Sequence, residues 1–322
     1  MQSLSHSLLQ PVAENALASA RYSPRKLVLI HTGGAMALGL LVSILTYVLD
    51  LGIAQTGGLS GIGNRATLQT LQTVLSMANT VLLPFWQIGY IFAVLQFARH
   101  QNPNPNSLFA GLRHWSVVLR GLFLKAGAVM LVIFFGTQLL LMMTPAGISM
   151  MELSAQMAES GADPMALLES EEYMALMMNA MPFLLIGVLI LLLPVLYLLR
   201  FSDYVMMDRP ERGALFALIA SIHLTRQNWK ALLKLDLRFW WYYALELLIG
   251  VISYGHLLLD VAGIHIGIGG DTAMFVFYLV SLGCQLGLYV WKKNSIFTTY
   301  ALAYDCISRP PEAPNSVSPE MI

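Results

Sequence analysis

Three ionisable residues lie inside otherwise apolar stretches of the chain, where a charge is costly. Glu246 lies eight positions after Arg238, which corresponds to about 12 Å along a helix. His31 and Lys125 each lie five positions after a basic residue, or about 7–8 Å along a helix. Ionisable groups at such depths line ion or proton pathways, or pair with one another. We expect His31, Lys125 and Glu246 to form one intramembrane polar cluster, with His31 or Lys125 as the partner of Glu246.

Each of these residues also has a purely structural interpretation. Glu246 would be a polar lock between helices, with its charge paired or its proton retained. Lys125 would extend its long side chain to the lipid headgroups, and His31 would be a hydrogen-bonded core histidine. The sequence alone leaves the structural and the functional interpretations open.

Other chemistry has weaker support. The glycine-rich loop 57–63 lacks the Gly-Lys-Ser/Thr ending of a phosphate-binding loop. Methionines are frequent over 150–181, but no His or Cys accompanies them, so packing is favoured over Cu(I) binding. The aromatic run 240–243 is typical of an interfacial belt. No hydrolase, zinc-protease or two-Cys metal motif occurs, so we assign no catalytic, cofactor-binding or metal residue.

The segments that carry these residues are long enough to cross a bilayer. Hydrophobic residues make up 57% of the chain, charged residues 11%, and the mean hydropathy is +0.66. Soluble domains average about 25% charged residues. We therefore predict an all-α, polytopic membrane bundle, which we treat as one domain over residues 1–307. The six predicted spans are 27–51, 74–97, 122–144, 182–199, 239–259 and 273–291.

The distribution of Lys and Arg predicts the orientation of the spans. Basic residues precede the first span, follow the sixth, and fill the loops between the second and third and between the fourth and fifth spans. The opposite loops hold only Arg65. By the positive-inside rule both termini are cytoplasmic. The zero net charge argues against a nucleic-acid partner, so the lipid bilayer and other membrane proteins are the expected partners.

Three further segments have distinct predictions. Two amphipathic stretches that begin near Ser107 and Ala214 repeat in the two halves of the chain, and we expect them to be cytoplasmic elbow helices in the headgroup layer. The acidic segment 145–181 lacks Lys and Arg, so we expect one or two short external helices, one of them beginning at Asp163. The proline-rich tail 308–322 is predicted to be disordered and cytoplasmic.

The last third of the chain carries a set of family-like motifs. They are Arg200-Phe201-Ser202, Tyr204, Asp208 with Pro210, Ala214-Leu215, Ser221, Asn228-Trp229-Lys230 and Tyr300-Ala301-Leu302-Ala303-Tyr304. With these motifs the chain resembles a bacterial integral membrane family known as domain of unknown function 975. The first half is similar in layout, at Pro24-Arg25-Lys26-Leu27 and in the loop 57–61. The resemblance implies a multi-span protein of the bacterial cytoplasmic (inner) membrane, and it implies no known activity.

Two classes of function follow from these observations. The preferred interpretation is a non-enzymatic envelope scaffold or an accessory subunit of a membrane complex. The alternative is a small-solute transporter or permease with Glu246 as a buried ionisable site, and a membrane enzyme is a weaker third. A transporter predicts interrupted spans beside a cavity with polar lining. A scaffold predicts a filled bundle with a docking surface.

Overall fold

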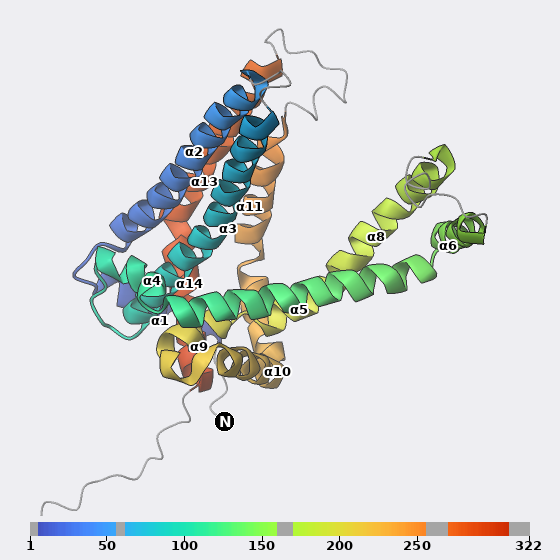
Figure 1. Cartoon of the computed structure of the whole chain (residues 1–322). Coiled ribbons are helices and arrows are strands. Elements are labelled where there is room, and N and C mark those ends of the chain that lie inside the picture. Colours follow the sequence, from blue (N-terminus) through green and yellow to red (C-terminus); the bar gives the residue numbers. More distant parts are fainter. Residues whose placement is uncertain (1–5, 56–61, 160–169, 256–269, 309–322) are drawn as a thin grey trace, which may run out of the picture. The chain divides into compact units, whose positions relative to one another are not determined.

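The computed structural model describes residues 6–55, 62–159, 170–255 and 270–308, and over these residues it is all-helical, without a strand (Figure 1). The predicted glycine loop, the helix start at Asp163 and the tail beyond residue 308 lie outside the described residues. The elements are α1 (His6–Ala18), α2 (Pro24–Gln55), α3 (Ile62–Ala98), η2 (Pro105–Phe109), α4 (Ala110–Arg113), α5 (Trp115–Met142), α6 (Pro145–Glu159), α8 (Glu171–Leu198), α9 (Ser202–Asp208), η3 (Pro210–Arg212), α10 (Gly213–Arg238), α11 (Trp240–Ser253), α13 (Gly270–Leu288), η4 (Tyr289–Lys293) and α14 (Asn294–Ser308).

The apolar helices are those of a multi-pass membrane protein, and the predicted all-α class is confirmed. Within the described ranges, five helical segments are long and apolar enough to cross a bilayer. They are Pro24–Leu49, Ala66–Ala98, Trp115–Met142, Tyr173–Asp208 and Phe275–Ser308. The predicted fifth span coincides with α11, a shorter apolar helix whose predicted continuation falls outside the described residues.

The residue contacts divide the chain into two compact units, and each unit is made of more than one segment of the sequence. The first unit comprises Met1–Val118, Asp203–Glu211 and Gln227–Ile322, and the second comprises Leu119–Ser202 and Arg212–Arg226. The single domain over residues 1–307 stays a prediction. Each unit is described separately below.

In the first unit, α2 packs on α3, α11 on α13, and α1 on α14 (Figure 1). Its largest fully buried side chains come from the ends of helices, with Tyr90 and Phe97 on α3, Leu27 on α2 and Tyr304 on α14. By contrast, many apolar side chains in the middle of α2 are exposed on the protein surface. This is the expected pattern for a membrane protein, because lipid covers apolar side chains as well as protein does.

Two glycines allow the backbone of α3 to approach the short helices that follow it. A Cβ built on Gly89 would collide with the carbonyl oxygen of Leu108 in η2, and one built on Gly111 of α4 would collide with that of Phe85. Asn104 caps η2 by accepting a hydrogen bond from the Ser107 backbone N–H at 3.2 Å. Small residues at such crossings bring backbones together, which is how membrane helices gain packing energy.

The second unit is built on α5, α6 and α8. Gly136 of α5 lies against the side chain of Leu191, and Gly187 of α8 lies against that of Leu140, so the two long helices touch at these two points. Helix α8 begins after Ser170, whose hydroxyl accepts a hydrogen bond from the Tyr173 N–H at 3.3 Å. Helix α6 packs on α8.

The start of α10 is tied to the end of α8 by hydroxyl groups. Ser221 donates a hydrogen bond to the Leu198 carbonyl at 2.8 Å and accepts one from the Phe201 N–H at 3.1 Å. Ser221 is fully buried. It therefore satisfies backbone groups that would otherwise be orphaned where α8 ends.

The two expected elbow stretches have different local structures. The first is interrupted at His114, whose backbone leaves the helical region (φ −105°, ψ 34°) before α5 begins at Trp115. The second lies within α10, which continues to Arg238 with one non-helical residue, Asn228. Their position in the headgroup layer stays a prediction.

Candidate functional site

A pocket of about 480 Å³ lies in the first unit between α11 and α13. It is lined by Glu246, Ile249, Gly250, Ser253, Tyr254, Phe275, Tyr278, Ser281 and Gln285. The lining residues recur every three or four positions on both helices, so each helix presents one face to the pocket. Gly250 contributes room, because a Cβ built there would meet no other atom within 4 Å.

Glu246 provides the acidic group of this pocket. One of its carboxylate oxygens, Oε1, accepts a hydrogen bond from the Tyr289 hydroxyl at 2.7 Å. Gln285 in turn donates from its amide nitrogen to the Tyr289 oxygen at 2.9 Å. Glu246 lines the pocket and forms no hydrogen bond to any other described residue, so its second oxygen, Oε2, keeps its lone pairs available.

A buried lysine lies behind Tyr289. Lys293 is 7% exposed, and its ammonium lies over the rings of Tyr289 at 4.2 Å, Tyr90 at 5.2 Å and Phe297 at 5.9 Å from the ring centroids. Aromatic faces attract a cation and replace part of its lost hydration. Glu246 is an acid close enough to attract Lys293 electrostatically, although the two groups form no ion pair within 4.0 Å.

His31 packs against Tyr90. Its imidazole is 4% exposed and its ring centroid lies 4.4 Å from that of Tyr90. The Gln87 side chain lies close enough to interact with the imidazole, although neither ring nitrogen forms a hydrogen bond of good geometry with a described residue. The His31 backbone carbonyl accepts a hydrogen bond from the indole N–H of Trp86 at 2.7 Å. His31 is therefore a buried imidazole that keeps hydrogen-bonding capacity.

The structure brings together two of the three residues singled out from the sequence. Glu246 is linked to Lys293 through Tyr289, and His31 packs on Tyr90, whose ring also lies near the Lys293 ammonium. Lys125 lies half-buried on α5, in the second unit. The hydrogen-bond partner that the structure gives Glu246 is Tyr289, which the sequence did not suggest.

Lys293 was missed because it follows the sixth predicted span and resembles an ordinary basic flank beside Lys292. The helix continues past it through a π-helical turn, η4, into α14. The available signal was the segment after Lys293, in which Ile296, Tyr300 and Tyr304 recur at helical spacing and predict another buried helix face.

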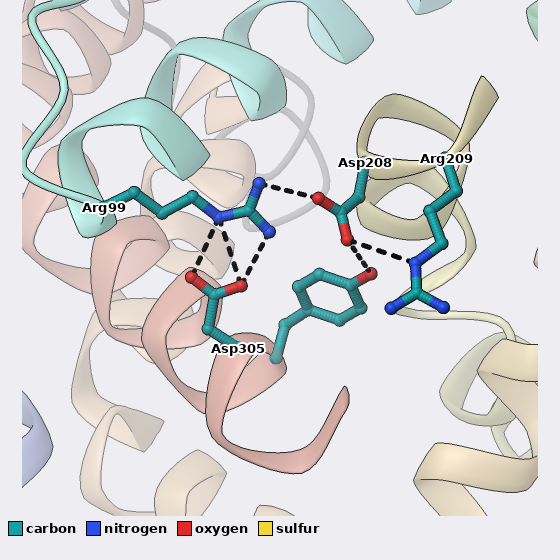
Figure 2. Close-up of polar contacts among 5 residues, drawn as sticks. Arg99, Asp208, Arg209 and Asp305 are labelled. Atoms are coloured by element: carbon teal, nitrogen blue, oxygen red, sulfur yellow. Dashed lines mark hydrogen bonds and ion pairs between the residues drawn. The ribbon is translucent and has the colours of Figure 1, made fainter. Parts of the chain in front are cut away.

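A second polar cluster joins three distant parts of the first unit (Figure 2). Arg99, just after α3, forms ion pairs with Asp208 at 2.6 Å and with Asp305 at 2.7 Å. Tyr304 donates to the other oxygen of Asp208 at 3.1 Å. Burial disfavours the charge on Arg99, but its hydrogen bonds to Asp305 and Asp208 and their negative charges outweigh burial and raise its pKa. This cluster connects α3, α9 and α14.

The titratable groups do not converge as metal ligands usually do. Within the described ranges, no three His, Cys, Asp or Glu side chains lie together as a group that could hold a metal ion. Both cysteines, Cys284 and Cys306, are free thiols. The pocket at Glu246 and the cluster at Arg99 are thus the two polar sites considered below.

Comparison of the chain with protein-family models, with curated proteins and with solved structures gives no match. Any functional conclusion therefore depends on the residues and their geometry.

Proposed function

We propose that the protein is a small-solute transporter of the bacterial cytoplasmic membrane, with the pocket at Glu246 as its binding site. The observation that carries this proposal is a carboxylate that lines an unfilled space between two apolar helices. An acidic side chain inside a membrane helix is costly, and in such places it usually belongs to a substrate or ion path. The pocket is also within the size range of small-molecule sites.

This proposal reverses the preference that the sequence suggested. A scaffold or accessory subunit predicts a filled bundle, whereas the facing sides of α11 and α13 leave about 480 Å³ between them. A transporter predicts an interrupted helix beside the site. The π-helical turn η4 supplies Tyr289, and π-turns of this kind are frequent at functional sites.

The predicted orientation gives the pocket a direction. Glu246 lies midway along α11, on the side nearer to the basic loop assigned to the cytoplasm, and Tyr254 lies at the end of the helix that is farther from this loop. A solute bound at Glu246 would enter from the outer half of the bilayer and leave past the cytoplasmic ends of the helices. The resemblance to the bacterial family of unknown function supports the bacterial membrane and leaves the solute open.

A binding screen followed by a flux measurement tests the proposal. The purified protein would be heated in detergent with small amines, carboxylates, sugars and neutral amphiphiles, and any solute that raises the melting temperature would be assayed for uptake into proteoliposomes. We expect at least one solute to stabilise the native protein and the control Glu211→Gln, whose exposed glutamate lies outside the pocket. The same solute should not change the melting temperature of Glu246→Gln. Proteoliposomes with this variant should take up no more solute than empty liposomes do.

The contrary result is equally clear. If no solute binds in a manner that depends on Glu246, and the protein instead co-purifies stoichiometrically with another membrane protein, the scaffold interpretation replaces the transporter.

A further inference from the structure

The pocket at Glu246 has a polar end and an aromatic end, and this division indicates a class of solute; the inference rests on the proposed transport function. Glu246 and Gln285 form the polar end. Tyr254, Phe275 and Tyr278 lie about two helical turns or more away along α11 and α13, which corresponds to roughly 10–15 Å. A ligand that fills this space must itself have one polar end and one apolar end.

The two serines of the pocket donate their hydroxyl protons within the protein, and Gln285 donates one of its two amide N–H groups. Ser253 donates its hydroxyl proton to the Gly250 carbonyl at 2.6 Å, and Ser281 donates to that of Tyr278 at 3.0 Å. Gln285 donates its amide N–H to Tyr289 at 2.9 Å. An ionised carboxylate such as Glu246 has no proton to donate. These four side chains therefore offer acceptors to a ligand, and the charge among them is negative.

Lys293 does not cancel this preference at the pocket surface. Its ammonium is held over three aromatic rings, it is buried, and it does not line the pocket. Tyr289 lies between Lys293 and the carboxylate, donating to Oε1. A ligand in the pocket therefore meets a Glu246 carboxylate that forms no ion pair with a described lysine or arginine.

We infer that the pocket binds an amphiphilic organic ammonium ion with a single positive charge. Its N–H groups donate to Glu246 Oε2 and to the Gln285 amide oxygen, which are charge-assisted hydrogen bonds for the carboxylate. Its apolar body lies over Gly250 and reaches Tyr254 and Phe275, where ring faces favour apolar or aromatic groups. An anion of the same shape would place its negative charge beside the Glu246 carboxylate, and this repulsion disfavours its binding.

A matched set of ligands tests the inference without knowledge of the natural solute. Phenylbutylamine, phenylbutanol and phenylbutanoate share one apolar body and differ in the charge of the head. Binding of each to the full-length protein in lipid nanodiscs would be measured by calorimetry. We expect the amine to bind at least roughly tenfold more tightly than the alcohol, and the carboxylate not to bind. Glu246→Gln should reduce amine binding roughly tenfold and leave alcohol binding unchanged.

A second variant tests the position of the apolar body. Gly250→Val places an apolar side chain in the pocket, and its Cβ meets no atom of the protein within 4 Å. We expect this variant to bind phenylbutylamine roughly tenfold more weakly. Its affinity for a short amine such as propylamine should stay unchanged. Gly283→Val on α13 is the control, because Gly283 has similar free space but does not line this pocket.

Two results would overturn the inference. One is equal binding of the amine and the alcohol, and the other is amine binding that is insensitive to both Glu246→Gln and Gly250→Val. If a solute of another class binds and is transported in a manner that depends on Glu246, the transport proposal survives and the ammonium ion is the wrong solute. If nothing binds at Glu246, both proposals fail.

Discussion

At the scale of single residues, buried charges in this protein are matched by different means. Lys293 is surrounded by aromatic rings, whereas Arg99 is matched by two carboxylates. The side chains of Arg99, Asp208 and Asp305 are 18%, 13% and 15% exposed, so water screens their ion pairs much less than it screens surface pairs. Removing Arg99 would leave two carboxylates close together with little solvent.

We therefore predict that Arg99→Met lowers the stability of the folded protein by about 2 kcal/mol. The measurement is chemical or thermal unfolding in detergent. Arg209→Met is the matched control, because Arg209 is 38% exposed and lies 3.8 Å from Asp208, at the edge of the ion-pair limit. Equal stability of the two variants would show that the cluster at Arg99 contributes no more than a surface ion pair does.

The same scale shows how far the sequence could locate the site. Glu246 could be found because an acid stands out within an apolar run, and His31 for a similar reason. Lys293 was harder to find, because its neighbour Lys292 and its position after an apolar run are typical of a membrane flank, and only the helical spacing of the residues after it indicates otherwise. Lys125 satisfied the same depth argument as His31 but lies in the other unit. Depth along a helix constrains neighbours in one dimension only, and packing decides the remaining two.

At the scale of helices, the contact between α3 and the short helices η2 and α4 depends on backbone proximity. Gly89 leaves no space for a side chain beside Leu108, and Gly111 leaves none beside Phe85. Both glycines occupy helical positions, where glycine by itself is less favourable than alanine by about 1 kcal/mol. Their presence there is explained by the crossing rather than by the helix.

We predict that Gly89→Ala destabilises the protein, since the added methyl group must displace backbone atoms of η2. Overpacking of this kind typically costs about 1–3 kcal/mol. Gly39→Ala on α2 is the control, and it should be neutral or slightly stabilising, because a Cβ there meets no atom within 4 Å. The melting temperatures of both variants in one detergent provide the comparison, and a stable Gly89→Ala protein would contradict the close crossing.

Helix positions were easier to predict than helix ends. The first four predicted spans fall on α2, α3, α5 and α8, and their C-terminal ends agree with those of the helices to within four residues, because a bilayer demands continuous apolar helix. The N-terminal ends differ more. Helix α8 begins at Glu171, eleven positions before the predicted span, since Ser170 caps it and polar residues continue the helix outside the apolar run. Helix α10 likewise runs on from the expected elbow to Arg238.

At the scale of the whole molecule, the arrangement of spans across the membrane is the prediction with the widest consequences. The basic loops place both termini in the cytoplasm and the segment around α6 outside. Glu159 at the end of α6 and Ser116 at the start of α5 are both exposed, so a reagent could reach either one.

We predict that an impermeant thiol reagent added to whole cells modifies Glu159→Cys and spares Ser116→Cys. Both variants would be made after replacement of Cys284 and Cys306 by serine, since both native thiols are free and exposed. Labelling of Ser116→Cys only after the membrane is permeabilised is the expected control result. Modification of Ser116→Cys in intact cells, with protection of Glu159→Cys, would invert the topology.

The π-helical turn η4 has a consequence for how this protein tolerates changes in chain length. A turn that closes over one extra residue shifts the phase of the helix, so side chains on either side of it differ by about 100° from an uninterrupted α-helix. Deleting Val290 would restore the α-helical phase. The deletion would keep every pocket residue of α13 and every ion-pairing residue of α14. It would, however, rotate either the pocket residues or the ion-pairing residues away from their partners. Within this turn the number of residues carries as much information as their identity, and a deletion or insertion there would cost more than most substitutions.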